Sequence, residues 1–291
     1  LAFNIYDTLV IPVQGGPGMA PHLAEKWEGD GTTFTFTLRQ DVKFSSGNPM
    51  TADDVVFSFD RMMAIGAGNS FLFQDVEKAE AVDPHTVRFT LKSPNAPFVS
   101  SLTRLPIVDK AVVMANLAEG EGEMKDWGKA YLTANSAGSG AYTVVSHNPQ
   151  DETVMAKNPA YFLPIAAEAP DTVRLRYGLD PATVRTLISQ GEHDLSSQWL
   201  RPEVKTAIAE GGGQLLSEGG TGGFYFKINT KKPPFDDENC RRAVVQAYDY
   251  TTGLRLVQVT GEVAEGTPAA GAIPAGMMGA GTTPIVQDLA A

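Results

Sequence analysis

The sequence predicts an α/β protein of two lobes. Predicted strands alternate with predicted helices along the chain, which argues for α/β lobes rather than for a sandwich or a helical bundle. The chain has 291 residues, a length that favours two ordinary domains over one large one. Hydrophobic residues make up 43% and charged residues 20%, which is typical of a globular protein.

The sharpest local pattern flanks the sequence "SSGNP". Before it, Phe34, Phe36 and Leu38 alternate with threonines, which predicts a strand with one buried face. The Gly-Asn-Pro run itself predicts a turn. After it, Thr51 and Asp54 have the spacing of a capping box, and apolar residues then recur at helical intervals. We therefore expect a strand, a turn and a capped helix in this order.

The middle of the chain continues the alternation. Strands are predicted over residues 76–82 and 86–91, on either side of the turn Asp83-Pro84-His85. The following elements are a helix within residues 106–119, a polar glycine-rich surface segment over 120–140, and two strands around a turn over 141–161.

The last third contains the clearest helix signals. Asp180 is placed to cap a helix that has Pro181 at its first position, and Gly191 is placed to end it. The remaining elements expected here are a helix over residues 202–210, a strand over 222–229 and a helix over 237–250.

Composition excludes several classes of function. Against 34 acidic residues there are 23 basic ones, and a net charge of −11 argues against nucleic acid as a partner. No apolar run approaches the roughly 20 residues that span a bilayer. The one cysteine, Cys240, excludes an internal disulfide and a cysteine-based zinc site, and we expect it to be half-buried on a helix. The four histidines show no metal-ligand spacing, so no metal and no cofactor are expected.

Sequence motifs of catalysis are missing as well. The sequence has no GxSxG, HExxH or GxxxxGK[ST] pattern, and its two Asp-Asp pairs stand at helix N-termini, where they favour the helix dipole. These observations favour a binding protein over an enzyme, although residues scattered in the sequence could still meet in space. The chain starts without methionine and ends in "GAGTTPIVQDLAA", so both ends are interpreted as cuts inside a longer protein.

The segment from Pro21 to Met62 carries a family resemblance. It contains Leu-Ala-Glu-x-Trp-Glu, Thr-Phe-x-Leu-Arg, Val-x-Phe, Gly-x-Pro and Thr-Ala-x-Asp-Val-Val in this order. This order of motifs resembles the family 5 extracytoplasmic solute-binding proteins, which are the peptide-, dipeptide- and nickel-binding receptors of ABC importers. Further matches follow over nearly the whole chain, at "AVDPHTVRFTLKSPNAPF", "GSGAYTV", "LISQGEHDLSSQWL" and "FYFKINTKKPPFDDENCRRAV".

The chain departs from the family pattern in one turn, at one helix position and in its length. Ser139 and Ala141 replace the family's Thr and Pro, and Cys240 replaces an apolar residue. Family members are considerably longer at both ends. The chain is therefore expected to be an N-terminal fragment that binds little solute by itself. Its expected domains are an N-terminal segment with a small accessory domain over 1–137, an α/β lobe I over 138–235 and the truncated start of the second lobe over 236–291.

The resemblance implies a type II periplasmic-binding-protein fold whose two lobes close over a solute. The implied partners are a peptide or similar small solute and, transiently, an ABC permease in the membrane. A monomer with a periplasmic or extracytoplasmic location is also implied. Alternatives within the binding class are an oligosaccharide, an opine, a nickel chelate or the role of a peptide sensor. An enzyme on the same scaffold is the alternative outside that class.

Residues that follow strand ends are the candidate solute contacts, because such positions face the cleft of an α/β lobe. Ser197, Gln198 and Trp199 come first, with Trp199 either a flat apolar wall or an ordinary surface residue. The further candidates are Ser139 and Gly140 through exposed backbone N–H groups, Tyr225 on its predicted strand, and Arg104 for a solute carboxylate. For Tyr225 the alternative is core packing, and for Arg104 a solvated surface position.

Overall fold

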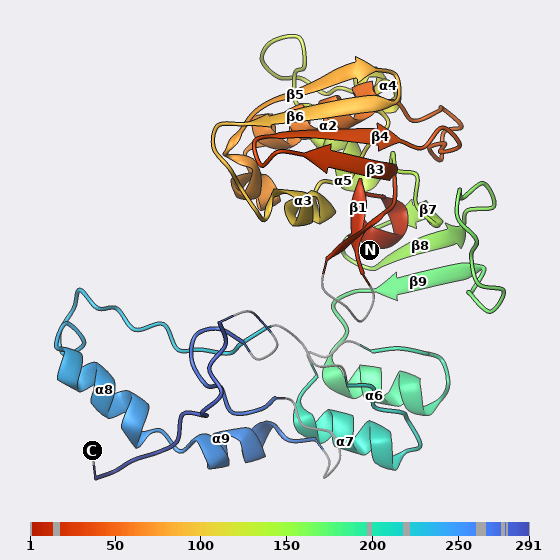
Figure 1. The fold of residues 1–291 in the computed structure, drawn as a ribbon. Coiled ribbons are helices and arrows are strands. Elements are labelled where there is room, and N and C mark those ends of the chain that lie inside the picture. The colour runs from red at the N-terminus through yellow and green to blue at the C-terminus, as the bar shows by residue number, and fades with distance from the viewer. Residues whose placement is uncertain are drawn as a thin grey trace. The chain divides into compact units, whose positions relative to one another are not determined.

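The computed structural model describes residues 2–13, 18–196, 200–217, 222–259, 266–274, 277 and 279–290. The chain forms two compact units, Leu1–Gly178 and Leu179–Ala291 (Figure 1). Each unit is considered by itself. The boundary at residue 178 falls inside the range 138–235 predicted for lobe I, and the predicted domain limits stay predictions.

A four-stranded antiparallel sheet is the centre of the first unit. Its strands, in spatial order, are β3 (Ala24–Gly29), β4 (Thr33–Leu38), β6 (Thr86–Leu91) and β5 (Val76–Asp83). Phe36 lies opposite Val87 on one side and Trp27 on the other, so the alternation read from the sequence sets the register. The predicted strand at residues 33–38 and the hairpin around Pro84 are confirmed.

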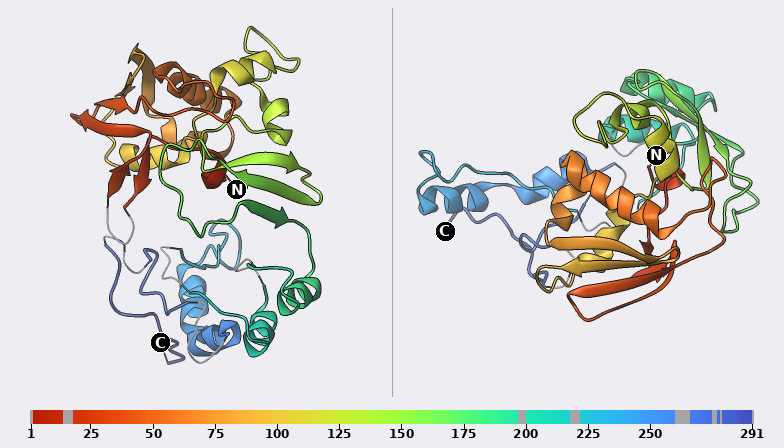
Figure 2. Two further views of the ribbon diagram at one scale, coloured as in Figure 1. Left: turned by 90° about the vertical axis from the view of Figure 1, so that its right-hand side faces the viewer. Right: turned by 90° about the horizontal axis from the view of Figure 1, so that it is seen from above.

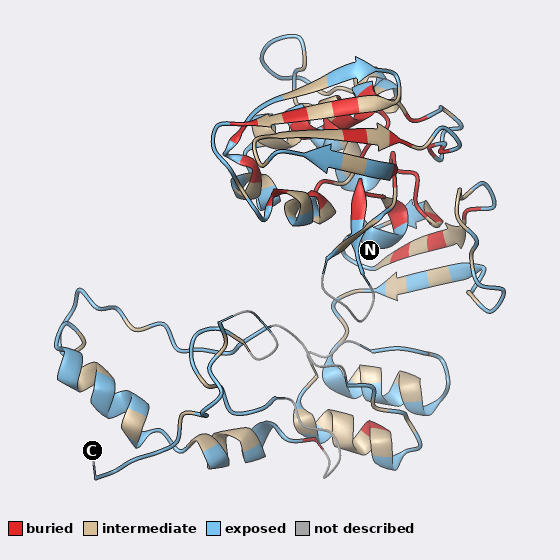
Figure 3. Cartoon of the chain, in the orientation of Figure 1, coloured by how far each residue is buried: buried red, intermediate tan, exposed pale blue. Residues whose placement is uncertain are grey.

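Helix α2 (Ala52–Ile65) lies along one face of this sheet (Figures 1 and 2). It begins with the predicted capping box and ends at Gly66, which adopts a left-handed conformation with φ 64°. Phe59 of this helix meets Phe89 of the sheet edge-on at 5.7 Å between ring centroids. Aromatic pairs in this geometry add to the energy of apolar burial. Figure 3 shows this buried layer between helix and sheet.

The first unit also contains shorter elements. They are α1 (Ala2–Ile5), β1 (Val10–Pro12), β2 (Met19–Pro21), η1 (Gly68–Phe73), α3 (Phe98–Ser101), η2 (Leu102–Arg104), α4 (Lys110–Ala115) and α5 (Lys129–Ala134). The helix predicted within residues 106–119 is confirmed as the shorter α4. Helix α5 lies in the segment predicted as polar surface; its residues are exposed or only half-buried, which explains the weak apolar signal.

Besides the four-stranded sheet and the two-stranded sheet of β1 and β2, the first unit contains a sheet of three antiparallel strands. It consists of β7 (Tyr142–His147), β8 (Glu152–Lys157) and β9 (Thr172–Arg176). Ile5 of α1 packs against Tyr142 and Met155 in a small core of its own. The two predicted strands are confirmed, whereas β9 was not predicted, although its apolar residues Val173 and Leu175 alternate with polar ones.

The described part of the second unit contains helices α6 (Pro181–Ser189), α7 (Pro202–Glu210), α8 (Glu238–Ala247) and α9 (Tyr250–Val257). Asp180 caps α6 through the N–H groups of Ala182 and Thr183, as predicted. The strand predicted over residues 222–229 is wrong for this structure, which shows extended chain without a paired strand there. A strand needs a neighbour for its backbone N–H and C=O groups, and no described segment of this unit is a strand.

Candidate functional site

The turn at residues 138–140, a predicted solute contact, packs directly against α1. The N–H of Gly140 donates to the carbonyl oxygen of Ile5 at 2.9 Å. A Cβ atom on Gly138 would lie 2.1 Å from that same oxygen, and one on Gly140 would lie 2.4 Å from the carbonyl oxygen of Asn4. The two glycines are therefore required by the close approach of two backbone segments.

Ser139, between these glycines, contributes to a buried polar cluster around Asp7. Its hydroxyl donates to Oδ2 of Asp7 at 2.7 Å. The other carboxylate oxygen, Oδ1, lies 2.8 Å from Nε2 of His22 and accepts a hydrogen bond from the Tyr161 hydroxyl at 3.1 Å. We call Asp7, His22, Ser139 and Tyr161 the Asp7 cluster. It ties together four segments that are far apart in the sequence.

Burial controls the electrostatics of the Asp7 cluster. Asp7 is 4% exposed and Ser139 is completely buried. Burial first, and then the neighbouring Asp7 carboxylate, raise the pKa of the Tyr161 hydroxyl above its ordinary value, so this group stays a neutral donor. Ser139 bonds to the carboxylate rather than to the His22 ring, so the cluster does not contain the Ser–His pair that activates a serine nucleophile. The cluster is suited to holding segments together.

Neither Asp7 nor His22 was singled out in the sequence. A signal was present in "NIYDTLV", where one acidic residue interrupts an apolar run. A carboxylate in such a position either points to solvent or is buried with hydrogen-bond donors around it. The choice between the two depends on residues 15 to 154 positions away, which local pattern does not reveal.

Ser139 and Gly140 therefore have partners inside the first unit. The Gly140 N–H is bonded to Ile5, and its carbonyl oxygen accepts from the Asn158 side chain at 2.9 Å. The exposed N–H groups on which the sequence interpretation relied are not seen at Gly140, which is buried. A contact between this turn and a solute stays a prediction, and the geometry favours a structural role for the turn.

Arg104 lies at the surface of the first unit. It is exposed at the end of η2, and its guanidinium carbon lies 5.7 Å from the ring centroid of Phe3. Phe3 is itself 70% exposed. A guanidinium held over an exposed aromatic ring remains accessible to an anion, so the geometry is compatible with the predicted solute contact.

Tyr225 lies in the second unit on the extended segment 222–229. It is 74% exposed, and its neighbours Phe224 and Phe226 are 92% and 79% exposed. Core packing, the alternative reading of Tyr225, does not occur in this structure. Ser197, Gln198 and Trp199 lie outside the described residues, so their predicted role stays untested.

The described residues offer no cluster of three or more His, Cys, Asp or Glu side chains that could hold a metal ion. Cys240 is half-buried on α8, as expected. Among the helices that the structure describes, none has the length and apolar character needed to cross a bilayer.

Comparison with known proteins gives matches along nearly the whole chain. The profile of the bacterial extracellular solute-binding proteins, family 5 (middle), matches residues 18–290. The probable D,D-dipeptide-binding periplasmic protein DdpA of Escherichia coli K12 is 30% identical over 91% of this chain and 50% of its own length. Di/tripeptide-binding protein 2 of Pseudomonas aeruginosa is 28% identical over 96% of this chain and 54% of its own length.

A solved structure shows the same fold. The periplasmic binding protein DppA of Helicobacter pylori, in complex with the peptide STSA, matches with a TM-score of 0.75 at 24% identity, over 98% of this chain and 58% of its own. The predicted periplasmic-binding-protein-like α/β fold is thereby confirmed. The chain spans about half the length of the curated relatives it matches.

Proposed function

Because the chain belongs to the bacterial extracellular solute-binding proteins of family 5, we propose that the protein is the substrate-binding component of an ABC uptake transporter. In this role it captures a short peptide or a similar small solute between two lobes and delivers it to a membrane permease. The family match over residues 18–290 is the observation that carries the proposal. The named binding partners of the two relatives, a D,D-dipeptide and di- or tripeptides, favour a short peptide over the other solutes.

The second unit supplies the proposed solute contacts other than Arg104, which belongs to the first unit. Tyr225 presents an exposed aromatic face, and Trp199 follows the segment 193–196 in the same unit. Binding sites for small molecules combine apolar walls with a few polar groups that fix orientation. We assign the walls to Trp199 and Tyr225 and the polar contacts to Ser197, Gln198 and, for a solute carboxylate, Arg104. The protein acts outside the cytoplasm, as a monomer and without turnover of its solute.

Calorimetric titration with dialanine and trialanine tests the proposal. We expect dissociation constants in the micromolar range for the complete protein, about −8 kcal/mol in free energy. Two further trialanine peptides, one blocked only at its amino terminus and the other only at its carboxyl terminus, then show which charged end is recognised. Binding of an opine or of a nickel–histidine complex in place of peptides would assign the solute differently within the same class.

Variants identify the contacts. Trp199→Ala and Tyr225→Ala are each expected to weaken peptide binding about tenfold or more, because each removes a large apolar contact surface. Phe71→Ala is the matched control, since Phe71 is an aromatic residue that is 63% exposed on η1 and has no proposed role. An equal loss of peptide affinity in Phe71→Ala would contradict the assignment of Trp199 and Tyr225 as solute contacts. Mass spectrometry of the peptide after long incubation checks for turnover, and cleaved peptide would replace the transport proposal by an enzymatic one.

A further inference from the structure

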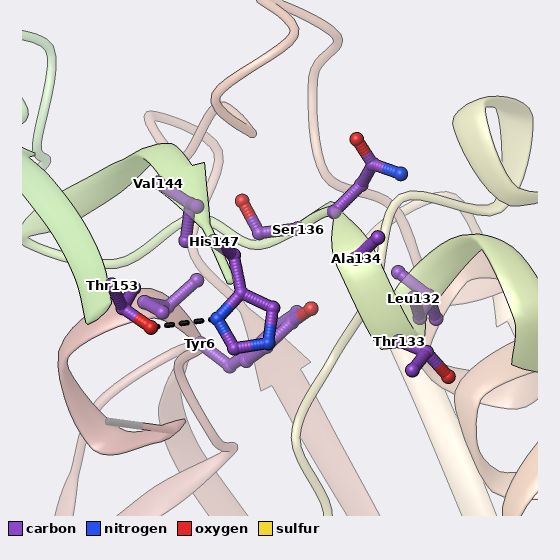
Figure 4. Close-up of a pocket in the computed structure, with 10 residues that line it drawn as sticks. Tyr6, Leu132, Thr133, Ala134, Ser136, Val144, His147 and Thr153 are labelled. Carbon is purple, nitrogen blue, oxygen red and sulfur yellow. Dashed lines mark hydrogen bonds between the residues drawn. The ribbon is translucent and has the colours of Figure 1, made fainter. Parts of the chain in front are cut away.

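The first unit contains a small pocket that is lined neither by the residues of the Asp7 cluster nor by the proposed solute contacts (Figure 4). It has a volume of about 130 Å³. Ile5 and Tyr6 line it from the α1 side, residues 132–136 line it where the chain leaves α5, and Val144, His147 and Thr153 line it from β7 and β8. A cavity of about 150 Å³ lined by apolar side chains accepts benzene, and this pocket is close to that size.

His147 is one of the polar groups of the pocket that is held in a fixed orientation. Its Nδ1 lies 2.6 Å from the hydroxyl of Thr153, which is completely buried. The Thr153 hydroxyl also lies 2.5 Å from the hydroxyl of Tyr177. This chain of hydrogen bonds fixes the ring and leaves Nε2 as its free nitrogen. Figure 4 shows Nε2 on the side of the ring away from Thr153.

The hydrogen-bond chain determines what Nε2 can bind. If Tyr177 donates to Thr153 and Thr153 donates to Nδ1, then Nε2 carries the proton and is a donor. If the chain runs in the other direction, Nε2 is an acceptor. A hydroxyl group pairs with either form, because it can donate and accept. A ligand with a hydroxyl therefore satisfies this site in both states.

The lining also limits the charge of a ligand. No Asp, Glu, Lys or Arg is among the described residues that line the pocket. An ionised ligand would lose hydration there without gaining an oppositely charged partner, which is unfavourable. Apolar side chains of Ile5, Leu132 and Val144 instead offer dispersion contacts to a flat ring.

We propose that this pocket binds a single neutral aromatic ring that carries a hydroxyl group, with the hydroxyl on Nε2 of His147 and the ring among Ile5, Leu132 and Val144. The ring has two sources of the same chemistry, a free phenol or the side chain of a tyrosine in a peptide. The site lies wholly in the first unit and does not rest on the proposed transport function.

The first test is an NMR titration with phenol that follows the His147 ring and the methyl groups of Ile5 and Val144. We expect saturable shifts of these three residues with a dissociation constant in the millimolar range, as suits a ligand of this size. A parallel titration with N-acetyl-tyrosinamide identifies the source: comparable or tighter binding points to a peptide-borne tyrosine, and weaker binding points to a free phenol. Absence of saturable shifts at these residues with either probe would overturn the proposal.

Two variants separate the hydrogen bond from the cavity. His147→Phe keeps a ring but removes Nε2, so we expect about fivefold to tenfold weaker phenol binding and unchanged toluene binding, as for one neutral hydrogen bond. Ala134→Phe fills the pocket from its exposed rim without replacing His147, and it is expected to abolish the binding of both phenol and toluene. His193→Phe, the same change at a histidine outside the pocket, should alter neither. Equal binding of phenol to the wild type and to His147→Phe would refute the assigned hydrogen bond.

Discussion

The hydroxyl of Ser139 donates a 2.7 Å hydrogen bond to the carboxylate of Asp7, 132 positions earlier in the chain. Both side chains are buried, and the same carboxylate accepts from Tyr161 and contacts His22. The Asp7 carboxylate thus links the N-terminal segment of the first unit to the turn at residues 138–140. Buried polar clusters of this kind stabilise only while every partner is present.

Replacement of Asp7 should therefore be costly. Asp7→Ala leaves the groups of His22, Ser139 and Tyr161 without their common acceptor inside the unit, and we expect a loss of about 3 kcal/mol in the free energy of unfolding. Urea denaturation followed by circular dichroism measures it. Asp151→Ala, at an exposed aspartate, is the control and should change stability by less than about 0.5 kcal/mol. Similar losses in both variants would contradict a structural role for the Asp7 cluster.

Gly138 should not tolerate a side chain. A Cβ atom 2.1 Å from the Ile5 carbonyl oxygen forces one of two backbone segments to move, so Gly138→Ala is expected to cost about 3 kcal/mol. Gly222→Ala is the matched control, because a Cβ there meets no atom within 4 Å. Thermal unfolding of both variants makes the comparison. A Gly138→Ala protein as stable as the control would mean that α1 does not pack against this turn.

Asp54 should make a pH-dependent contribution to the free energy of unfolding, and this contribution should decrease as pH rises. It accepts from Thr51 and from the N–H of Lys110, yet burial raises its pKa above the ordinary value for aspartate. The folded state therefore binds this proton more tightly than the unfolded state does. The contribution is fully present below about pH 4, the ordinary aspartate value, and is lost as pH rises through the higher folded pKa.

The variant Asp54→Asn isolates this contribution. The destabilisation caused by the substitution should be largest near pH 3 and should shrink as pH rises toward neutrality. Urea unfolding of both proteins at a series of pH values measures the difference. A difference that grows with pH would show that the hydrogen bonds, rather than burial, dominate the ionisation of Asp54.

Asp126 should behave in the opposite way. The backbone N–H of Ala130, and then those of Gly128 and Ala118, donate to its carboxylate and lower its pKa. This stabilisation is present above the ordinary aspartate pKa and is lost as pH falls through the lower folded value. Asp126→Asn should therefore destabilise the protein at pH 7 and approach the wild type in acid. An equal difference at both pH values would mean that the carboxylate charge plays no part.

Local patterns in the sequence were sufficient for elements whose partners are nearby. The alternation at Phe34, Phe36 and Leu38 gave β4, and the Thr51–Asp54 capping box gave the start of α2. These signals depend on the 2-residue and 3.6-residue periods and on caps within one turn, so they survive without knowledge of the rest of the fold. Their agreement with family motifs also led to the correct family.

Elements that depend on a distant partner were predicted less well. Strand β9 was not predicted: its five residues alternate as a strand does, but its pairing with β8 is not visible from the segment itself. Residues 222–229 alternate as a strand does, yet no strand forms there in the described structure. The periodicity of a segment reports which face it can bury, whereas pairing requires a second segment in reach.

For the candidate sites the division is the same. The sequence by itself determined the family, the α/β class and the set of residue types suited to hold a solute, because these depend on order and composition along the chain. Only the tertiary structure decided that Ser139 donates a hydrogen bond to Asp7, that Gly140 packs on Ile5, and that His147 is hydrogen-bonded to Thr153 at a pocket. Hydrogen bonds between segments depend on distances of about 3 Å that the packed core creates, and no local pattern encodes those distances.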